Sequence, residues 1–204
     1  IAGKLIKETN VELFNFYTSF LKRAKKTLDI ILSVIGKENI TIKEAWELNE
    51  RHYGSLTGLN KEETKNQLGE KTFNNYRRSW NIAPPPLNKN SKYHKNFGRL
   101  NMSLPRYAIP DTESLKDTFE RVIPYYKGNI EPEILSGKKI LIAAHGNSLR
   151  ALCKHLFNIS NSKINFLEIP TGNPLCIEFS TNYSKISKAF YLDKKREKPL
   201  FFNK

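Results

Sequence analysis

One short stretch limits the fold more than any other, a run of apolar residues that ends in a histidine and a glycine. The apolar run covers residues 140–144, and two lysines precede it. Such a run between polar residues is typical of a buried strand in a parallel sheet. His145 and Gly146 follow, and a helical pattern begins at Asn147 or Ser148. The stretch therefore predicts strand, tight turn and helix, which is a unit of an α/β sheet.

Strand and helix patterns alternate along the rest of the chain. Strand patterns cover residues 14–19, 40–42, 174–179 and 186–192, and helical patterns cover 19–36, 61–69, 70–80 and 114–126. We expect helix N-caps at Thr18–Ser19, Asn60 and Ser114, because these side chains accept hydrogen bonds from free backbone amides. The alternation predicts one α/β domain over residues 1–204, a three-layer sandwich with a mostly parallel central sheet. Residues 88–111 are polar and irregular, and they are interpreted either as a lid or as a surface insertion.

Composition narrows the class of protein. Charged residues make up 26% of the chain and apolar residues 39%, which is ordinary for a globular protein. No apolar run approaches the roughly 20 residues that span a bilayer, and no signal-peptide pattern opens the chain. Cys153 and Cys176 both lie in apolar segments. We therefore expect buried thiols in a reduced, cytoplasmic protein that binds no membrane.

The formal net charge of +14 indicates an affinity for anions. The alternative is that most lysines only solvate the surface. Nucleic acid is not the expected partner, because no motif interleaves arginines with aromatic residues for base stacking. Arginine grips phosphate with two parallel hydrogen bonds, and four arginines lie in motif-like segments: Arg23, Arg51, Arg77 and Arg78.

The segment 48–61 combines groups that are unusual together in one loop. Glu50, Arg51, Tyr53 and Lys61 bring a carboxylate, two cations and a phenol. A loop with a possible proton donor beside anion-binding groups is typical of one wall of an active site. Alternatives remain, since Glu50 and Arg51 could form a surface salt bridge, and Arg77–Arg78 could be a solvated helix end.

The turn after residue 144 predicts the second wall. Ligands of α/β sheets bind beyond the carboxyl ends of the strands, where His145 would lie. The amides of Gly146 and Asn147 would open a helix, a position that favours anions. Phosphate in such a pocket would push Glu50 toward its protonated form, which suits proton exchange with a substrate hydroxyl. The two walls indicate chemistry on a phosphorylated small molecule, whereas His94 and His155 are interpreted as structural.

These segments resemble the cofactor-dependent phosphoglycerate mutases of the histidine phosphatase superfamily. The matching blocks follow the family's order over nearly the whole chain, and they are residues 18–24, 48–61, 76–79 with 84–86, 113–118, 143–150 and 169–174.

The resemblance implies an isomerase of glycolysis and gluconeogenesis. It would interconvert 2- and 3-phosphoglycerate by ping-pong transfer through a phosphohistidine, with 2,3-bisphosphoglycerate as primer and without a metal. Glu50 is similar to the family's proton donor and acceptor, and His145 to its second active-site histidine. Substrate-binding positions correspond to Arg23, Arg51, His52, Tyr53, Lys61, Arg77, Arg78, Gly146 and Asn147. Relatives are often dimers or tetramers.

One departure concerns the nucleophile. The family's carrier histidine lies in an Arg-His-Gly segment at the end of an N-terminal strand, and the tripeptide does not occur in these 204 residues. We therefore expect an N-terminally incomplete phosphoglycerate mutase-like domain that lacks one central strand. A bisphosphoglycerate synthase or phosphatase of the same family, and a catalytically incompetent fragment, remain as alternative functions.

Overall fold

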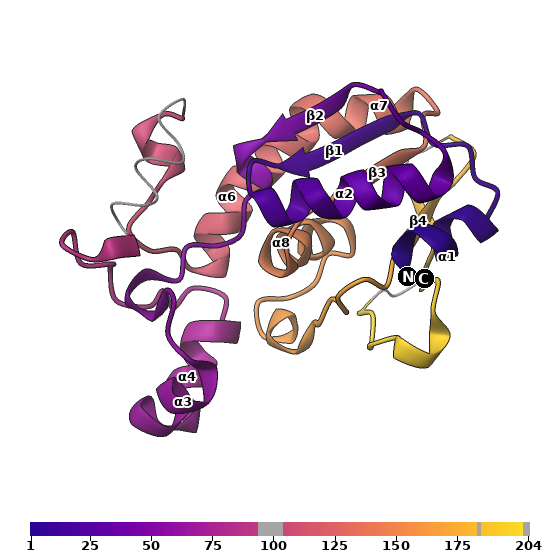
Figure 1. Ribbon diagram of the computed structural model, residues 1–204. Helices are drawn as coiled ribbons and strands as arrows, with labels where there is room; N and C mark the ends of the chain where they lie inside the picture. Colours follow the sequence, from indigo (N-terminus) through magenta and orange to yellow (C-terminus); the bar gives the residue numbers. More distant parts are fainter. Residues whose placement is uncertain (94–103, 183–184, 202–204) are drawn as a thin grey trace.

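A parallel sheet of three strands lies at the centre of the fold (Figure 1). The computed structural model describes residues 1–93, 104–182 and 185–201. The strands are β1 (Asn15–Ser19), β2 (Ile42–Ala45) and β3 (Ile140–Ala143), and their order in the sheet is β2-β1-β3. Ser19 pairs with Ala45, and Thr18 pairs with Ala143, so all three carboxyl ends meet at one edge. The segments that follow these strands therefore emerge side by side.

Alternating side chains of β1 reach opposite faces of the sheet, as the period of two requires. Phe16 packs with the residues buried under α1 (Ala2–Glu8) and α2 (Lys22–Ile35). Tyr17 packs into the larger core with α6 (Leu115–Tyr125) and α8 (Gly146–Leu156). Helices therefore cover both faces, which confirms the three-layer α/β arrangement predicted from the sequence.

Two smaller parts complete the described fold. The helices α3 (Lys61–Leu68) and α4 (Glu70–Arg78) project away from the sheet in Figure 1. After Pro124, α6 continues as a π-helical turn (Tyr126–Ile130) and then as α7 (Glu131–Leu135). Near the C-terminus, β4 (Leu175–Phe179) and β5 (Ile186–Tyr191) pair antiparallel in a sheet of their own.

Several local predictions are confirmed. Gly36 ends α2 in the left-handed region at φ 72°. Asn60 caps α3 through the amides of Glu62 and Glu63, and Ser114 with Asp117 forms a capping box at α6. Of the two thiols predicted to be buried, Cys153 is buried, whereas Cys176 is only half-buried, and both are free.

Two predictions need correction. The N-cap at Thr18–Ser19 is wrong, because both residues belong to β1 and the N-cap of α2 is Leu21. The strand predicted over 140–144 forms as β3, but its predicted burial is wrong in part, since Ala143 is buried and residues 140–142 are half-buried. Within the described residues β3 pairs with β1 alone, so its other edge has no strand partner.

Part of the irregular segment predicted over 88–111 cannot be compared. Residues 94–103, including His94, lie outside the described residues. Within the described ranges no helix is long and apolar enough to cross a membrane.

Candidate active site

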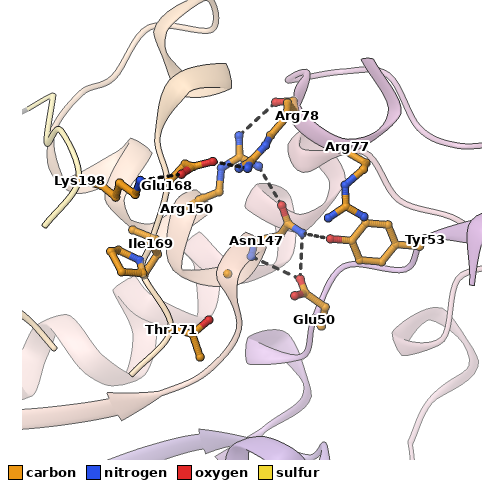
Figure 2. A pocket seen from close by; sticks show the side chains of 12 residues that line it. Glu50, Tyr53, Arg77, Arg78, Asn147, Arg150, Glu168, Ile169, Thr171 and Lys198 are labelled. Carbon is orange, nitrogen blue, oxygen red and sulfur yellow. Dashed lines mark hydrogen bonds and ion pairs between the residues drawn. The ribbon is translucent and has the colours of Figure 1, made fainter. Parts of the chain in front are cut away.

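The two walls predicted from the sequence meet at the carboxyl edge of the sheet, around Glu50 (Figure 2). Glu50 Oε1 accepts hydrogen bonds from the Asn147 side-chain Nδ2 at 3.0 Å and from the Asn147 backbone amide at 3.3 Å. The backbone amide of Arg51 donates to the same oxygen at 2.8 Å. The carboxylate therefore lies at the N-terminal end of α8, where the helix dipole favours negative charge.

All three of these hydrogen bonds use one carboxylate oxygen. Within the described part of the chain, Oε2 of Glu50 accepts no hydrogen bond. One oxygen is thus fixed by the protein, while the other remains available to exchange a proton with a ligand. This division suits a general acid–base group, which must be held firmly and still reach its substrate.

A cavity of about 300 Å³ opens beside Glu50. Its cationic members come from three separate segments, Arg77 and Arg78 from α4, Arg150 from α8, and Lys198 from the C-terminal segment. The remaining lining residues are Tyr53, Gly146, Asn147, Glu168, Ile169, Pro170 and Thr171. These four cations outnumber the two carboxylates of the lining, Glu50 and Glu168, so the cavity fits an anionic ligand.

Two buried arginines hold the C-terminal end of α4 beside this cavity. Arg51, which is 2% exposed, donates from Nη2 to the carbonyl of Tyr76 at 2.8 Å. Arg150 donates from Nη2 to the carbonyl of Arg78 at 3.1 Å. These carbonyls lack partners within the helix, and two cations satisfy them. Arg77 and Arg78 are therefore held by specific contacts and do not form a freely solvated helix end.

The side chain of Arg51 also excludes one alternative interpretation of the loop. Its guanidinium stacks over the Tyr53 ring at 4.7 Å and donates to α4 rather than pairing with Glu50. The proposed surface salt bridge between Glu50 and Arg51 is therefore wrong.

His145 is held in one tautomer at the N-cap of α8. Arg23 Nε donates to Nδ1 at 3.1 Å, so the ring proton lies on Nε2, which contacts Ser19 Oγ at 2.7 Å. Burial, with the nearby cations Arg23 and Arg121, lowers the pKa of His145 to about 3. The imidazole is therefore neutral near neutral pH and acts as an N–H donor, not as a cation.

A buried ion pair fixes the backbone of the Glu50 loop. Arg121 Nε lies 2.7 Å from Glu113 Oε1, and Nη2 donates to the carbonyls of Asn49 and Glu50. Glu113 Oε2 accepts from the His52 amide at 2.8 Å. The loop is therefore attached to α6 by this ion pair.

Comparison with known proteins assigns the family. The model of the histidine phosphatase superfamily (branch 1) matches residues 2–93 and 87–190. This chain belongs to the histidine phosphatase superfamily. A 2,3-bisphosphoglycerate-dependent phosphoglycerate mutase of Pelagibacter ubique (strain HTCC1062) is 50% identical over 98% of this chain and 83% of the relative. The mutase of the same name from Caulobacter sp. (strain K31) is 46% identical over 97% of this chain and 82% of the relative.

Solved structures support the histidine phosphatase fold. A mycobacterial glucosyl-3-phosphoglycerate phosphatase in complex with inorganic phosphate has a TM-score of 0.59 at 15% identity, covering 93% of this chain and 79% of that one. The α-ribazole phosphatase of Shigella flexneri has a TM-score of 0.58 at 16% identity, covering 91% of this chain and 78% of that one. At this identity the likeness concerns the fold alone.

The histidine phosphatase site brings together most, but not all, of the residues that the sequence singled out. Those that line the cavity are Glu50, Tyr53, Arg77, Arg78, Gly146 and Asn147. Arg51 lies behind the Tyr53 ring, and Arg23 contacts His145. The half-buried His52 bonds Glu113 through its backbone, and Lys61 is exposed at the start of α3, so neither lines the cavity.

Sequence reasoning missed three charged residues of this histidine phosphatase cavity: Arg150, Glu168 and Lys198. Arg150 had a signal, since it stands three residues after Asn147 and therefore shares its helix face. Glu168 forms an ion pair with Arg78, and its Oε2 lies 3.8 Å from Lys198 Nζ. Nothing local in the sequence distinguishes these two residues from ordinary surface charges.

The described residues contain no group of three or more His, Cys, Asp or Glu side chains that could hold a metal ion.

Proposed function

We propose that this histidine phosphatase is a 2,3-bisphosphoglycerate-dependent phosphoglycerate mutase, which interconverts 2-phosphoglycerate and 3-phosphoglycerate. The observation that carries the proposal is the cavity that Glu50 lines together with Arg77 and Arg78. Relatives at up to 50% identity over nearly the whole chain carry that name. The proposal places the reaction in glycolysis and gluconeogenesis, in the cytoplasm.

The residues present fit a bisphosphorylated ligand. Two phosphate monoesters and a carboxylate carry roughly four to five negative charges at neutral pH. Among the described residues, the buried atoms Arg51 Nε, Arg51 Nη1 and Arg150 Nε have no hydrogen-bond partner. Buried N–H groups without partners are costly, so an anion near them would be stabilised.

Each residue then has a distinct role in the proposed reaction. Glu50 gives and takes the proton of the substrate hydroxyl through Oε2. Neutral His145, which the cavity lining does not include, stabilises charge on the transferring phosphoryl group once its Nε2–H exchanges Ser19 Oγ for a phosphoryl oxygen. Arg77 and Arg78 hold the phosphates and the carboxylate. Phosphoryl transfer needs mainly such positioning and charge stabilisation. The primer supplies the phosphoryl group, and the resemblance assigns its carrier to an Arg-His-Gly histidine.

The test is a coupled mutase assay on the full-length protein with 3-phosphoglycerate, with and without 2,3-bisphosphoglycerate. We expect turnover that rises steeply when the primer is added. Absence of turnover, or turnover that is indifferent to the primer, would refute the proposal.

The same preparation distinguishes the other activities of the family. Release of inorganic phosphate from 2,3-bisphosphoglycerate, or its net synthesis, is measured beside the mutase rate. We expect the mutase rate to exceed both. Gel filtration with light scattering tests the further expectation of a homodimer or homotetramer.

A further inference from the structure

Arg150 is a buried cation whose partners are all uncharged. Its side chain is 3% exposed and makes three hydrogen bonds. Nη1 donates to Asn147 Oδ1 at 2.9 Å, and Nη2 donates to the carbonyls of Ile164 at 2.7 Å and Arg78 at 3.1 Å. In the described ranges no carboxylate forms an ion pair with it. A guanidinium buried in this way is costly, so its hydrogen bonds must have a structural consequence.

The first consequence is the orientation of the Asn147 amide. A side-chain amide can rotate by half a turn, which exchanges its donor and its acceptor end. Here the Arg150 N–H occupies Oδ1, so Nδ2 must face Glu50 at 3.0 Å and the Tyr53 hydroxyl at 2.8 Å. The reversed amide would place donor against donor at Arg150 and oxygen against oxygen at Glu50. Arg150 therefore decides which end of the amide meets the carboxylate.

The second consequence concerns α4. This helix has no buried residue of its own, yet its last residue, Arg78, faces the cavity. The bond from Arg150 to the Arg78 carbonyl attaches this helix end to α8. One guanidinium thus joins the Glu50 contact and the Arg78 backbone, which come from segments far apart in the sequence.

We propose that Arg150 is a positioning residue of this site, which orients the Asn147 amide toward Glu50. It does not donate a proton to the reaction. It acts through Asn147, which holds Glu50 Oε1 and leaves Oε2 for the substrate. The kinetic part of this inference rests on the proposed mutase function, whereas the orientation of the amide does not.

The effect that the Arg150 hydrogen bonds have on Glu50 has to be separated from the effect of the positive charge of Arg150. The charged and titratable groups around Glu50 come from its own loop, from α4, α6 and α8, and from the segment towards the C-terminus. They are Arg51, Tyr53, Arg77, Arg78, Arg121, His145, Arg150, Glu168 and Lys198. Removing any cationic side chain of this set would raise the pKa of a nearby carboxylate through the loss of its positive charge alone. A variant that keeps the charge but loses the three-way geometry is therefore needed.

Arg150→Lys is that variant, because an ammonium group keeps the charge but lacks the planar fork that bonds in two directions. Arg150→Met removes both properties, and Lys154→Met is the matched control on the same helix, outside the cavity. We expect kcat to fall on the order of 10-fold to 100-fold in both Arg150 variants, since small misplacement of a reacting group is costly. The acid limb of the kcat/KM profile should move to higher pH in both, and Lys154→Met should match the wild type.

Wild-type behaviour of Arg150→Lys in rate and pH profile would overturn the proposal, because charge alone would then suffice. A double-mutant cycle with Asn147→Ala tests the route. If Arg150 acts through Asn147, adding Arg150→Lys to Asn147→Ala should cost less than twofold further in kcat. Full additivity of the two effects would also overturn it.

A measurement that needs no enzymatic turnover tests the orientation of the Asn147 amide independently of the proposed function. The side-chain NH₂ resonances of Asn147, observed by ¹⁵N NMR, should be protected from exchange in the wild type and in Lys154→Met. We expect the protection to be lost in Arg150→Lys. Retained protection contradicts the inference even if the wild type shows no mutase turnover, and folding of each variant is checked by circular dichroism.

Discussion

At the scale of single residues, the site depends on which atom of each group is already engaged. Glu50 uses Oε1 for three protein hydrogen bonds, and His145 uses Nδ1 for Arg23. Oε2 of Glu50 remains for a ligand, whereas Nε2 of His145 lies 2.7 Å from Ser19 Oγ, and its N–H must leave that oxygen to serve one. This assignment leads to two predictions that treat the groups separately.

The first prediction concerns the proton carried by Glu50. Glu50→Gln keeps the acceptor oxygen but cannot exchange a proton at the working pH. We expect kcat to fall by about 10²–10⁴-fold, the usual contribution of general acid–base catalysis, with KM nearly unchanged. Steady-state kinetics check this, with Glu120→Gln on the exposed face of α6 as control. An unaltered kcat would make Glu50 a structural residue.

The second prediction concerns pH and His145. Its pKa of about 3 in the folded protein lies below the ordinary 6.5, so the unfolded chain binds its proton more readily. The stability that it contributes is complete above pH 6.5 and is lost as the pH falls from 6.5 toward 3. Between pH 7 and pH 5 this group should remove about 2 kcal/mol from the free energy of unfolding.

Urea denaturation at both pH values measures the loss. In His145→Gln the difference between pH 7 and pH 5 should shrink, because a glutamine does not titrate. Equal differences in the two proteins would show that His145 is protonated in the folded state at pH 5.

At the scale of elements, the Glu50 loop is shaped by close backbone contacts. Gly54 has φ +53°, and an added Cβ would lie 2.1 Å from the Pro85 carbonyl oxygen and 2.8 Å from Thr112 Oγ1. The Ser55 amide donates to the same Pro85 carbonyl at 2.8 Å. The loop and the proline segment are thus packed too closely for any side chain at this position.

Gly54→Ala should therefore destabilise the protein by about 2 kcal/mol or more, through strain at positive φ and the clash. The matched control is Gly128→Ala, since a Cβ there meets nothing within 4 Å. That change should be neutral or slightly stabilising, because alanine restricts the unfolded chain. Thermal unfolding of both variants checks the contrast, and equal melting temperatures would contradict it.

At the scale of the whole molecule, buried charges connect segments that are distant in the sequence. Arg121 on α6 reaches the carbonyls of Glu47, Asn49 and Glu50, and it pairs with Glu113. The two side chains are only 10% and 4% exposed. Removing one partner would leave the other charge buried without compensation.

Arg121→Met should therefore lower the free energy of unfolding by about 3–5 kcal/mol, measured by urea denaturation. The exposed pair of Lys65 and Glu70 is the control, because solvent screens it. Lys65→Met should leave the denaturation midpoint almost unchanged. If both variants unfolded at the same urea concentration, burial of the Arg121 pair would not matter for stability.

Most of the secondary structure could be predicted from the sequence because it follows local periodicity and local caps. The strand at 140–144, the caps at Asn60 and Ser114, and Gly36 at a helix end are examples. The cap predicted at Ser19 failed for a tertiary reason, since that hydroxyl lies in β1 and contacts His145 instead. A capping residue can be recognised from the sequence, but the tertiary partners that compete for its side chain cannot.

The sequence by itself determined the two walls, because Glu50, Tyr53, His145 and Asn147 lie within short segments of unusual composition. Only the tertiary structure decided that Arg150 bonds Asn147, that Glu168 pairs with Arg78, and that His52 and Lys61 lie outside the cavity. The physical reason is that a side-chain contact between distant segments depends on burial and packing direction. Neither is encoded in the neighbours of a residue along the chain.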